Sequence, residues 1–363
     1  MKLSQILVTV TVLSTLMCIL ITRKLTHKSF GETTNFISKD GNVDDRDDVT
    51  EKILKMTTGD MKNNMSDLKT SIQQNTVDLP TPQSWFKSTY IINEESLCRN
   101  NNTDILFYIH TAPNHKNRRD IIRSTWGGRT QYRDYNITVV FLLGHSNDSK
   151  INKGIHNEST IHHDIIQGTF RDTYLNLTYK ARMGLTWVNT YCSNTRYIIK
   201  TDDDVFVNIP ILIKTLVELE DKNKTENLLM CRVRHGGGVI RDKRYKNQVS
   251  EDEYDVHDPD IFPDFCPGLA FVLSKNAFIK IHGALRQYTR FLSVDDVYVT
   301  GILAKTAGLK HTDSTKLTGI VGPGGAKWEK YRDLDRTSLN QYMFILVEGK
   351  PESLGELWKK LKF

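Results

Sequence analysis

Short apolar runs alternate with longer mixed segments along the chain beyond residue 100. Helical spacing predicts helices at residues 117–126 and 175–190, and residues 161–167 are expected to form a strand and a turn. Brief runs of β-branched and aromatic residues predict buried strands, at residues 105–110, 139–143 (closed by Gly144) and 197–200. Strands that alternate with helices indicate an α/β fold, in which helices flank a mixed, mostly parallel sheet.

A much longer apolar run lies near the start of the chain. Its 17 residues, 6–22, carry only apolar or hydroxyl-bearing side chains, and Arg23 and Lys24 follow them. At about 1.5 Å per residue such a helix spans roughly 25 Å, the low end for crossing a membrane. A cleaved signal peptide is the alternative, but the run is long for one and lacks a small-x-small cleavage site. We expect a cytoplasmic tail at 1–5, a signal-anchor helix at 6–22, a polar lumenal stem at 23–97 and a folded domain at 98–363.

Sequons for N-linked glycosylation indicate which side of the membrane the folded domain occupies. All seven Asn-x-Ser/Thr sequons follow the apolar run, at Asn64, Asn101, Asn136, Asn147, Asn157, Asn176 and Asn223. Because this modification is made in the secretory lumen, the sequons favour a lumenal body and a single-pass type II orientation.

Cysteine usage fits the same compartment. One of five cysteines, Cys18, lies in the apolar run, and four remain for an oxidising environment. Four cysteines allow three pairings. We expect two disulfides, with Cys98–Cys192 and Cys231–Cys266 as the favoured pairing. A zinc site is disfavoured because no Cys-x-x-Cys pair occurs.

Composition excludes one class of partner. The net charge of +6 is modest for 363 residues, and no basic tract or basic-aromatic alternation occurs. Nucleic acid is therefore not an expected partner.

Three consecutive carboxylates, Asp202, Asp203 and Asp204, interrupt an apolar stretch. Their charges repel one another, and burying them unpaired is costly. A divalent cation resolves that cost, because Mg²⁺ and Mn²⁺ prefer carboxylate oxygens. An EF-hand calcium loop is excluded, because Val207 and Ile213 stand where it needs Gly and Glu. A metal site is favoured over the alternative of a solvated acidic turn.

Five sequence blocks carry a family resemblance. They are RRDIIRSTWG at 118–127, FRDTYLNLTYK at 170–180, KTDDDVFVN at 200–208, FPDFCPG at 262–268 and VDDVYVTG at 294–301. In this order they resemble the β-1,3-glycosyltransferase family, which contains β-1,3-galactosyltransferases and β-1,3-N-acetylglucosaminyltransferases. The resemblance runs from about residue 104 to 359. It implies a GT-A-type nucleotide-sugar-binding fold, a UDP-sugar donor, Mn²⁺ (or Mg²⁺), an inverting mechanism and a location in the Golgi membrane with the catalytic domain in the lumen.

The resemblance also implies roles for the acidic residues. Asp204 is the expected chief metal ligand, while Asp202 and Asp203 are expected to contact the uridine ribose and the metal. The family places its general base in the pair Asp295-Asp296, and we expect Asp296 to be that base. The same pair suits the N-cap of a helix at residues 297–307, for which Asp295 is the expected capping residue.

Three basic residues are expected to bind the donor. Arg119 and Arg123 lie one helical turn apart, and guanidinium groups suit phosphate. Without the resemblance, solvation of the helix surface is the simpler role for both. Lys180, after Asn-Leu-Thr, is expected to contact uracil or phosphate.

Two other segments are expected on the acceptor side. Residues 239–242 and 262–274 resemble the strands that line it in the family.

Two departures from the family pattern concern the acceptor and the metal. Asn247 stands where the family has an aromatic residue, and an acidic insertion follows at 255–260. Glu348 stands where a strand usually ends in a metal-ligating His. Because Mn²⁺ accepts carboxylate, we expect Glu348 to be a third metal ligand.

These observations lead to one expected function and its alternatives. We expect an inverting β-1,3-glycosyltransferase that moves a hexose, galactose, from a UDP-sugar to a hydroxyl of an acceptor glycan on protein or lipid. Transfer of N-acetylglucosamine or N-acetylgalactosamine is one alternative, and a catalytically silent sugar-binding module is another. Homo-oligomerisation stays open.

Overall fold

Four parallel strands form the centre of the fold, and their buried apolar residues explain their position. The computed structural model describes residues 89–255, 260–321, 328–347 and 352–361. The central strands stand in the order β5-β4-β2-β6. They are β5 (Ile165–Arg171), β4 (Tyr135–His145), β2 (Ile105–His110) and β6 (Tyr197–Asp202), all pairing in parallel. Every residue of β2 is buried, as expected for a strand covered on both faces.

Further strands join this sheet, most of them in antiparallel pairings, so the sheet is mixed as predicted. At one edge β1 (Tyr90–Ile92) pairs with β5, and β3 (Gln131–Tyr132) pairs with β4. At the other, β9 (Ala270–Ser274) pairs antiparallel with β6, followed by β8 (Leu229–Cys231) and β10 (His311–Asp313). A small second sheet has the order β11-β12-β7, formed by Thr318–Val321, Phe344–Val347 and Val205–Val207.

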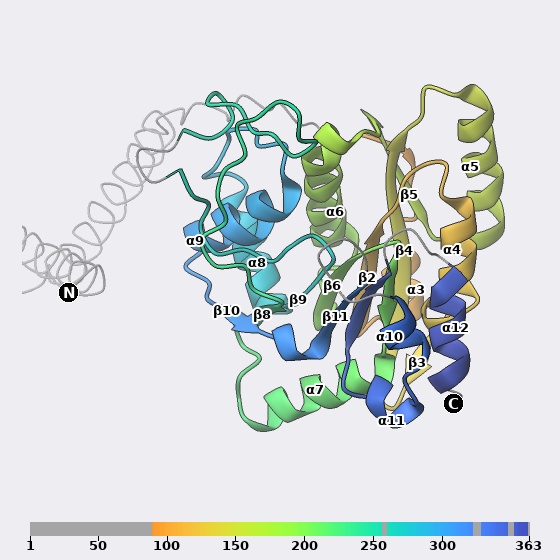
Figure 1. Ribbon diagram of the computed structural model, residues 1–363. Helices are drawn as coiled ribbons and strands as arrows, with labels where there is room; N and C mark the ends of the chain where they lie inside the picture. The colour runs from red at the N-terminus through yellow and green to blue at the C-terminus, as the bar shows by residue number, and fades with distance from the viewer. Residues whose placement is uncertain (1–88, 256–259, 322–327, 348–351, 362–363) are drawn as a thin grey trace, which may run out of the picture. The chain divides into compact units, whose positions relative to one another are not determined.

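Helices cover both faces of the main sheet (Figure 1). One face is packed by α6 (Leu177–Tyr191), α8 (Lys275–Ala284) and the π-helix η3 (Val297–Leu303), which continues into α9 (Ala304–Thr306). The other is packed by α4 (Lys116–Arg123), α5 (Ser149–His162), α7 (Ile209–Asp221) and α12 (Glu352–Leu361). Shorter helical turns are α3 (Leu97–Asn101), η1 (Trp126–Gly128), η2 (Tyr174–Asn176), η4 (Thr315–Leu317), α10 (Trp328–Arg332) and α11 (Arg336–Leu339).

Strand alternation divides the core into two layers. In β2, Ile105 and Phe107 pack with the α4 side, while Leu106 and Tyr108 pack with the α6 side. Successive side chains of a strand point to opposite faces, so one short run supplies both cores. The central sheet is thereby held rigidly between two helical layers.

The predicted strands at 105–110 and 197–200 and the helix at 175–190 are confirmed with small shifts. The predicted strand at 139–143 is too short, because β4 already starts at Tyr135 and continues through Gly144. The helix predicted to reach residue 126 ends at Arg123. There the hydroxyls of Ser124 and Thr125 donate to the Ile121 carbonyl, which competes with continuation of the helix. Residues 161–162 belong to α5 rather than to a strand.

The folded body begins earlier than the predicted start at residue 98, because β1 already pairs with β5. The chain divides into the units Met1–Leu79 and Pro80–Phe363, and the first lies outside the described residues. The predicted tail at 1–5, the signal-anchor helix at 6–22 and most of the stem at 23–97 also lie outside them. Within the described part, no helix has the length and apolarity to cross a bilayer.

The favoured disulfide pairing is confirmed. Cys98 of α3 is bonded to Cys192 at the end of α6, and Cys231 at the end of β8 is bonded to Cys266. The second bond joins β8 to the segment that leads into β9, on the side where the candidate site lies.

Candidate active site

Two parallel strands bring the candidate residues to one edge of the sheet. In the β2–β6 pair, His110 is the register partner of Asp202. Ligands of parallel sheets bind at the carboxyl ends of the strands. β6 ends at Asp202, the chain turns at Asp203 and Asp204, and β7 begins at Val205. The acidic triplet therefore lies where a ligand is expected.

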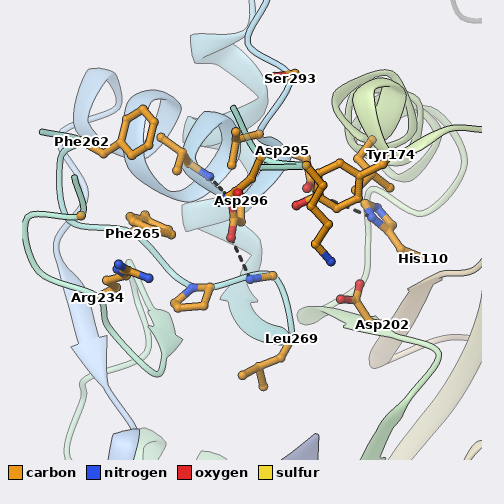
Figure 2. Close-up of a pocket in the computed structure, with 18 of the residues that line it drawn as sticks. His110, Tyr174, Asp202, Arg234, Phe262, Phe265, Leu269, Ser293, Asp295 and Asp296 are labelled. Carbon is orange, nitrogen blue, oxygen red and sulfur yellow. Dashed lines mark hydrogen bonds and ion pairs between the residues drawn. The ribbon is translucent and has the colours of Figure 1, made fainter. Parts of the chain in front are cut away.

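This turn forms one wall of a cavity of about 420 Å³. Asp202 and Asp204 line it from the turn, and Asp295 and Asp296 line it from the segment before η3. In Figure 2, Asp202 and His110 lie on one side of the view and Arg234 and Phe265 on the other, with Asp296 between them. The lining also includes Tyr174, Lys200, Arg232, Lys246, Asn247 and Gly268. Two of the expected metal ligands, Asp202 and Asp204, thus face one space with the expected base, Asp296.

Two backbone amides hold the Asp296 carboxylate. Its Oδ1 accepts from the Val297 N–H at 2.8 Å and its Oδ2 from the Gly268 N–H at 3.0 Å. Burial and the neighbouring charge of Asp295 raise the pKa of Asp296 to about 6. A carboxylate with a raised pKa is a stronger proton acceptor, as a general base requires.

The expected division of labour between Asp295 and Asp296 is wrong in one respect. Asp296, not Asp295, is the N-cap of η3. The reason is geometric, since Asp296 directly precedes the helix and its Oδ1 reaches the first helical N–H. Asp295 instead faces His110, whose Nδ1 lies 3.5 Å from its Oδ2.

Asp202 is paired with a buried lysine. The Lys200 Nζ donates to the Asp202 Oδ1 at 2.6 Å and also to the Gly268 carbonyl. The Asp202 side chain is 39% exposed and lines the cavity. Desolvation raises the pKa of Asp202 to about 7; the Lys200 ammonium lowers it and the charge of Asp204 raises it. Asp202 therefore carries charge that its protein partners do not fully neutralise.

Asp203 differs from its two neighbours, because it points away from the cavity into protein. Its carboxylate accepts from the Thr111 hydroxyl at 2.6 Å and from Arg118 at 2.8 Å, and lies 2.8 Å from the His115 Nδ1. Burial alone would raise the pKa of Asp203, but the hydrogen bonds from His115 and Thr111 lower it. Its expected contact with ribose stays a prediction, and in this structure its oxygens are occupied by the protein.

Asp204 keeps an incompletely neutralised charge in the cavity. Arg118 lies 3.3 Å from its Oδ2. Burial and the charge of Asp203 nevertheless raise the pKa of Asp204. Within the described ranges, no three His, Cys, Asp or Glu side chains form a complete metal-binding group. Asp202 and Asp204 are two hard oxygen donors, which fits Mg²⁺ or Mn²⁺ sites that use one or two carboxylates together with substrate phosphates.

Arg119 and Arg123, expected in the donor site, lie outside the cavity lining. Arg119 is fully buried and makes a bidentate contact with Glu158, at 2.8 and 2.7 Å. Arg123 binds Asp164 through two nitrogens, both at 2.8 Å, and also contacts Glu158. These pairs attach α4 to α5 and to the start of β5. Both guanidinium groups are thus engaged by protein carboxylates.

Lys180 is also buried outside the cavity lining. Its Nζ donates to the Thr111 carbonyl at 2.6 Å and lies 3.0 Å from Asp172. Asp172 in turn accepts from the Gly144 N–H at 2.6 Å. Lys180 therefore joins the ends of β2 and β4 to the loop before α6, and its expected donor contact stays a prediction.

Sequence reasoning missed four residues that the structure brings to the site. Arg118 contacts both Asp203 and Asp204, whereas donor binding was predicted for Arg119 and Arg123 on the same helix. Lys200 was detectable as a lysine inside a buried strand. Tyr174 lines the cavity, and burial together with the charges of Asp296 and Asp295 raises its pKa to about 12.

His110, the fourth, ends β2 beside Asp295. Its Nε2 is buried with no hydrogen-bond partner among the described residues. Burial and the charges of Lys200 and Lys180 lower the pKa of His110 well below its usual range. His110 thus lines the cavity as a neutral ring with one buried, unsatisfied nitrogen.

The structure describes only some of the residues that depart from the family pattern and only some of the sequons. Asn247 lines the cavity, and Asp260 of the acidic insertion pairs with Arg241 at 2.8 Å. Glu348, residues 256–259 and Asn64 lie outside the described residues, as does the side chain of Asn101. Asn147, Asn157 and Asn223 are exposed, whereas Asn136 and Asn176 are half-buried. Occupancy of the sequons stays a prediction.

Comparison with known proteins identifies the family of the chain. Residues 117–315, more than half of the chain, match the family model described as galactosyltransferase. The chain is 36% identical over 228 residues to lactosylceramide 1,3-N-acetyl-beta-D-glucosaminyltransferase A of Xenopus laevis, which covers 61% of this chain and 59% of that protein. It is 36% identical over 221 residues to beta-1,3-galactosyltransferase 1 of Mus musculus, covering 61% of this chain and 65% of that protein.

These alignments span less than two thirds of each relative's length. Among solved structures, the apo bifunctional glycosyltransferase WbbM matches with a TM-score of 0.39 and 11% identity, over 72% of this chain and 50% of that chain. That similarity is too low to support an argument. The family model covers the helix α4, the acidic turn and the Asp295-Asp296 pair, and the chain therefore belongs to the galactosyltransferase family.

Proposed function

We propose that this protein is an inverting β-1,3-glycosyltransferase that transfers galactose from a UDP-sugar to a hydroxyl of an acceptor glycan. The observation that carries the proposal is the shared cavity of Asp204 and Asp296, both incompletely neutralised carboxylates. Asp204 suits a cation that neutralises the charge of the departing nucleotide, and Asp296 suits a base that takes the proton of the incoming alcohol. Family membership and the GT-A-like arrangement of a mixed sheet flanked by helices support the same reaction.

Asp296 acts as the general base in this proposal. The amides of Val297 and Gly268 fix the carboxylate, and each oxygen keeps a further lone pair for the acceptor hydroxyl. As the acceptor oxygen attacks C1 of an α-linked donor from the opposite face, Asp296 takes its proton. The sugar–diphosphate bond breaks, UDP leaves, and the product has a β linkage. A positioned base of this kind typically contributes about 10²–10⁴ in rate.

Asp204 and Asp202 would hold the divalent cation, Mn²⁺ or Mg²⁺. When bound, such a cation supplies positive charge to the oxygens of the leaving diphosphate. Arg118 stays beside Asp204 and orients its carboxylate, while Lys200 fixes Asp202 at the end of β6. Asp203 anchors the turn through Thr111, so that the other two aspartates face the cavity.

Glu348 remains our proposed third ligand. The last described residue of β12, Val347, donates its N–H to the Asp204 carbonyl at 2.8 Å, and Glu348 is the next residue in sequence. We expect Glu348→Ala to raise the Mn²⁺ concentration needed for half-maximal activity by about tenfold or more, the cost typical of a lost metal contact. A Glu352→Ala variant, an exposed glutamate of α12, is the matched control. An unchanged Mn²⁺ dependence would remove Glu348 from the site.

In this proposal Arg119, Arg123 and Lys180 hold the elements that carry the site. The first two fix α4, whose Arg118 faces the acidic turn. Lys180 fixes the end of β2 through the Thr111 carbonyl, and Thr111 in turn holds Asp203. Their proposed role is to stabilise the fold around the aspartates rather than to act on the donor.

We also propose a lumenal catalytic domain that includes residues 98–363, on a type II Golgi membrane protein. Two disulfides and the exposed sequons at Asn147, Asn157 and Asn223 support an oxidising secretory compartment. The acceptor glycan, on protein or lipid, is consistent with that location.

N-acetylglucosamine is the second candidate donor sugar, because a relative named for its transfer is as similar as one named for galactose transfer. The test is a panel. The full-length protein is incubated with Mn²⁺ and each of UDP-galactose, UDP-N-acetylglucosamine and UDP-N-acetylgalactosamine, and UDP release is measured with and without acceptor glycans. Acceptor-dependent release with UDP-galactose, lost in Asp296→Asn, is the expected result. Binding of sugars without turnover for every pair would instead indicate a silent sugar-binding module.

A further inference from the structure

We propose that the acceptor glycan carries an anionic group, a carboxylate or a sulfate ester, and that Arg232 and Arg234 bind it. The inference rests on the proposed transferase function and names the class of its acceptor. It is carried by the location of the two arginines and by their lack of acidic partners in the described structure.

Both arginines line the cavity, and Arg234 lies on the side of Asp296 away from the proposed metal ligand Asp202. They follow β8, and Arg234 exchanges two backbone hydrogen bonds with Phe265, at 2.8 and 3.1 Å. Phe265 is three residues before Gly268, whose N–H donates to Asp296. Figure 2 shows Arg234 and Phe265 on the side of Asp296 away from Asp202. Since Asp296 receives the acceptor's proton in the proposed reaction, Arg234 faces the acceptor.

The two guanidinium groups differ from other arginines in the protein. Arg119, Arg123 and Arg241 each contact a carboxylate at 2.8 Å or closer. Along the ranges that the structure describes, no carboxylate lies within ion-pair distance of Arg232 or Arg234. Guanidinium is built for bidentate contact with carboxylate and related oxyanions. Two such groups that line one cavity without a protein partner suit an anionic ligand.

The donor diphosphate is the competing anion, but the sheet order places it elsewhere. The proposed metal ligands Asp202 and Asp204 stand at the end of β6, and β9 separates β6 from β8. The cations Lys200 and Arg118 already stand on the β6 side. The arginines after β8 are therefore one strand removed from the end where the diphosphate would bind.

Lys246, another cation of the cavity lining, does not belong to this arginine pair. Its Nζ lies 5.0 Å from the centre of the Tyr174 ring, and both residues line the cavity and are exposed. Figure 2 shows Tyr174 beside His110, on the side of Asp296 where Asp202 lies. The proposed anion site therefore consists of Arg232 and Arg234 alone.

The experiment compares matched acceptors with the full-length protein. Initial rates are measured with UDP-galactose, Mn²⁺ and three oligosaccharides of the same backbone: one neutral, one with a sulfate ester, and one in which a uronic acid replaces the neighbouring hexose. We expect kcat/KM at least tenfold higher for one or both anionic acceptors, and a preference that weakens as salt is raised. The sulfate and uronate arms identify the source of the charge.

Variants then assign the preference to the arginines. In Arg232→Gln/Arg234→Gln we expect the acceptor KM to rise about tenfold for the anionic glycan, with kcat and the KM for UDP-galactose unchanged. Arg232→Lys/Arg234→Lys should restore part of the preference. The control is Arg244→Gln, an exposed arginine paired with Asp242 outside the cavity lining, which should behave as wild type. Melting temperatures verify that each variant is folded.

The outcomes separate this inference from the proposed function. Efficient transfer to the neutral glycan without preference for either anionic glycan overturns the anionic acceptor and leaves the transferase intact. A rise in the KM for UDP-galactose in the double Gln variant assigns the arginines to the diphosphate and also overturns it. Transfer to no acceptor, with UDP release insensitive to Asp296→Asn, overturns both proposals.

Discussion

Two groups of charged residues behave in opposite ways, although the sequence predicts an active-site role for members of both. The paired cluster lies between α4, α5 and β5 and consists of Arg119, Arg123, Glu158 and Asp164. The cavity aspartates are Asp202, Asp204 and Asp296. In the paired cluster, burial alone would raise the pKa of Glu158, but the hydrogen bonds from Arg119 and Arg123 lower it. In the cavity, burial and like charges raise the pKa values.

The two groups differ in whether protein partners neutralise their carboxylates. Carboxylates that meet guanidinium groups inside the protein hold helices in place and leave nothing for a ligand. Carboxylates that are gathered without full compensation cost stability, and such groups concentrate at functional sites. The residue types alone do not distinguish the two clusters; their partners do.

The largest expected effect comes from removing the base. Asp296→Asn should lower kcat by about 10²–10⁴-fold, the usual contribution of a general base, while the amide oxygen still caps η3. Transfer rates and the melting temperature of the full-length protein check this. Asp295→Asn is the matched control and should retain most of the activity. Equal losses in the two variants would contradict the assignment of the base to Asp296.

Breaking the paired cluster should affect stability instead of chemistry. Arg119→Met leaves Glu158 buried without its bidentate partner, which typically costs about 3–5 kcal/mol. Denaturant unfolding of the full-length protein measures the loss, and kcat per folded molecule should stay near wild type. The double variant Arg119→Met/Glu158→Leu should recover much of the stability, because the unpaired buried carboxylate is removed while Arg123 keeps its pair with Asp164. A selective rise in the donor KM in a folded Arg119→Met protein would instead support a direct donor contact.

Ligands should neutralise the cavity aspartates. Mn²⁺ together with UDP binds only the folded state, so at about 100 times Kd it should add roughly 2.7 kcal/mol of stability. The measurement is the melting temperature with and without EDTA. Asp204→Asn should abolish most of the shift, whereas Asp313→Asn, a carboxylate outside the cavity lining, should preserve it. A shift that survives Asp204→Asn would place the cation elsewhere.

The sequence predicts the fold well where the pattern is local. The six buried residues of β2 and the strand that ends at Asp202 follow directly from apolar runs. α5 was missed because it is a mostly polar helix without a sustained apolar face. β1, a three-residue edge strand, was missed because only its pairing with β5 defines it.

The site was predictable in its residue types but not in its pairings. The acidic triplet and the Asp295-Asp296 pair stand out in the sequence, and the structure brings them to one cavity. Which arginine faces the triplet depends on the rotation of α4, so Arg118 was missed in favour of Arg119. The capping residue was misassigned for a similar reason, because one residue decides where η3 begins.

The smallest expected effect is the pH dependence, and the two groups should differ in its sign. A base with a pKa of about 6 loses its function as it is protonated, so kcat/KM should fall about tenfold per pH unit below 6. Over the same range Asp296 should make the folded protein more stable. Its folded pKa is raised, so its stability contribution is complete below the unfolded value and is lost as pH rises through about 6. Glu158 acts oppositely, because its pKa is lowered and its contribution to stability is lost only as pH falls below the usual glutamate range.

Denaturant unfolding in EDTA at about pH 5.0 and about pH 7.5, on either side of the Asp296 pKa of about 6, compares wild type with Asp296→Asn. The stability of the variant relative to wild type should rise between the two pH values, and a constant difference would contradict the raised pKa of Asp296.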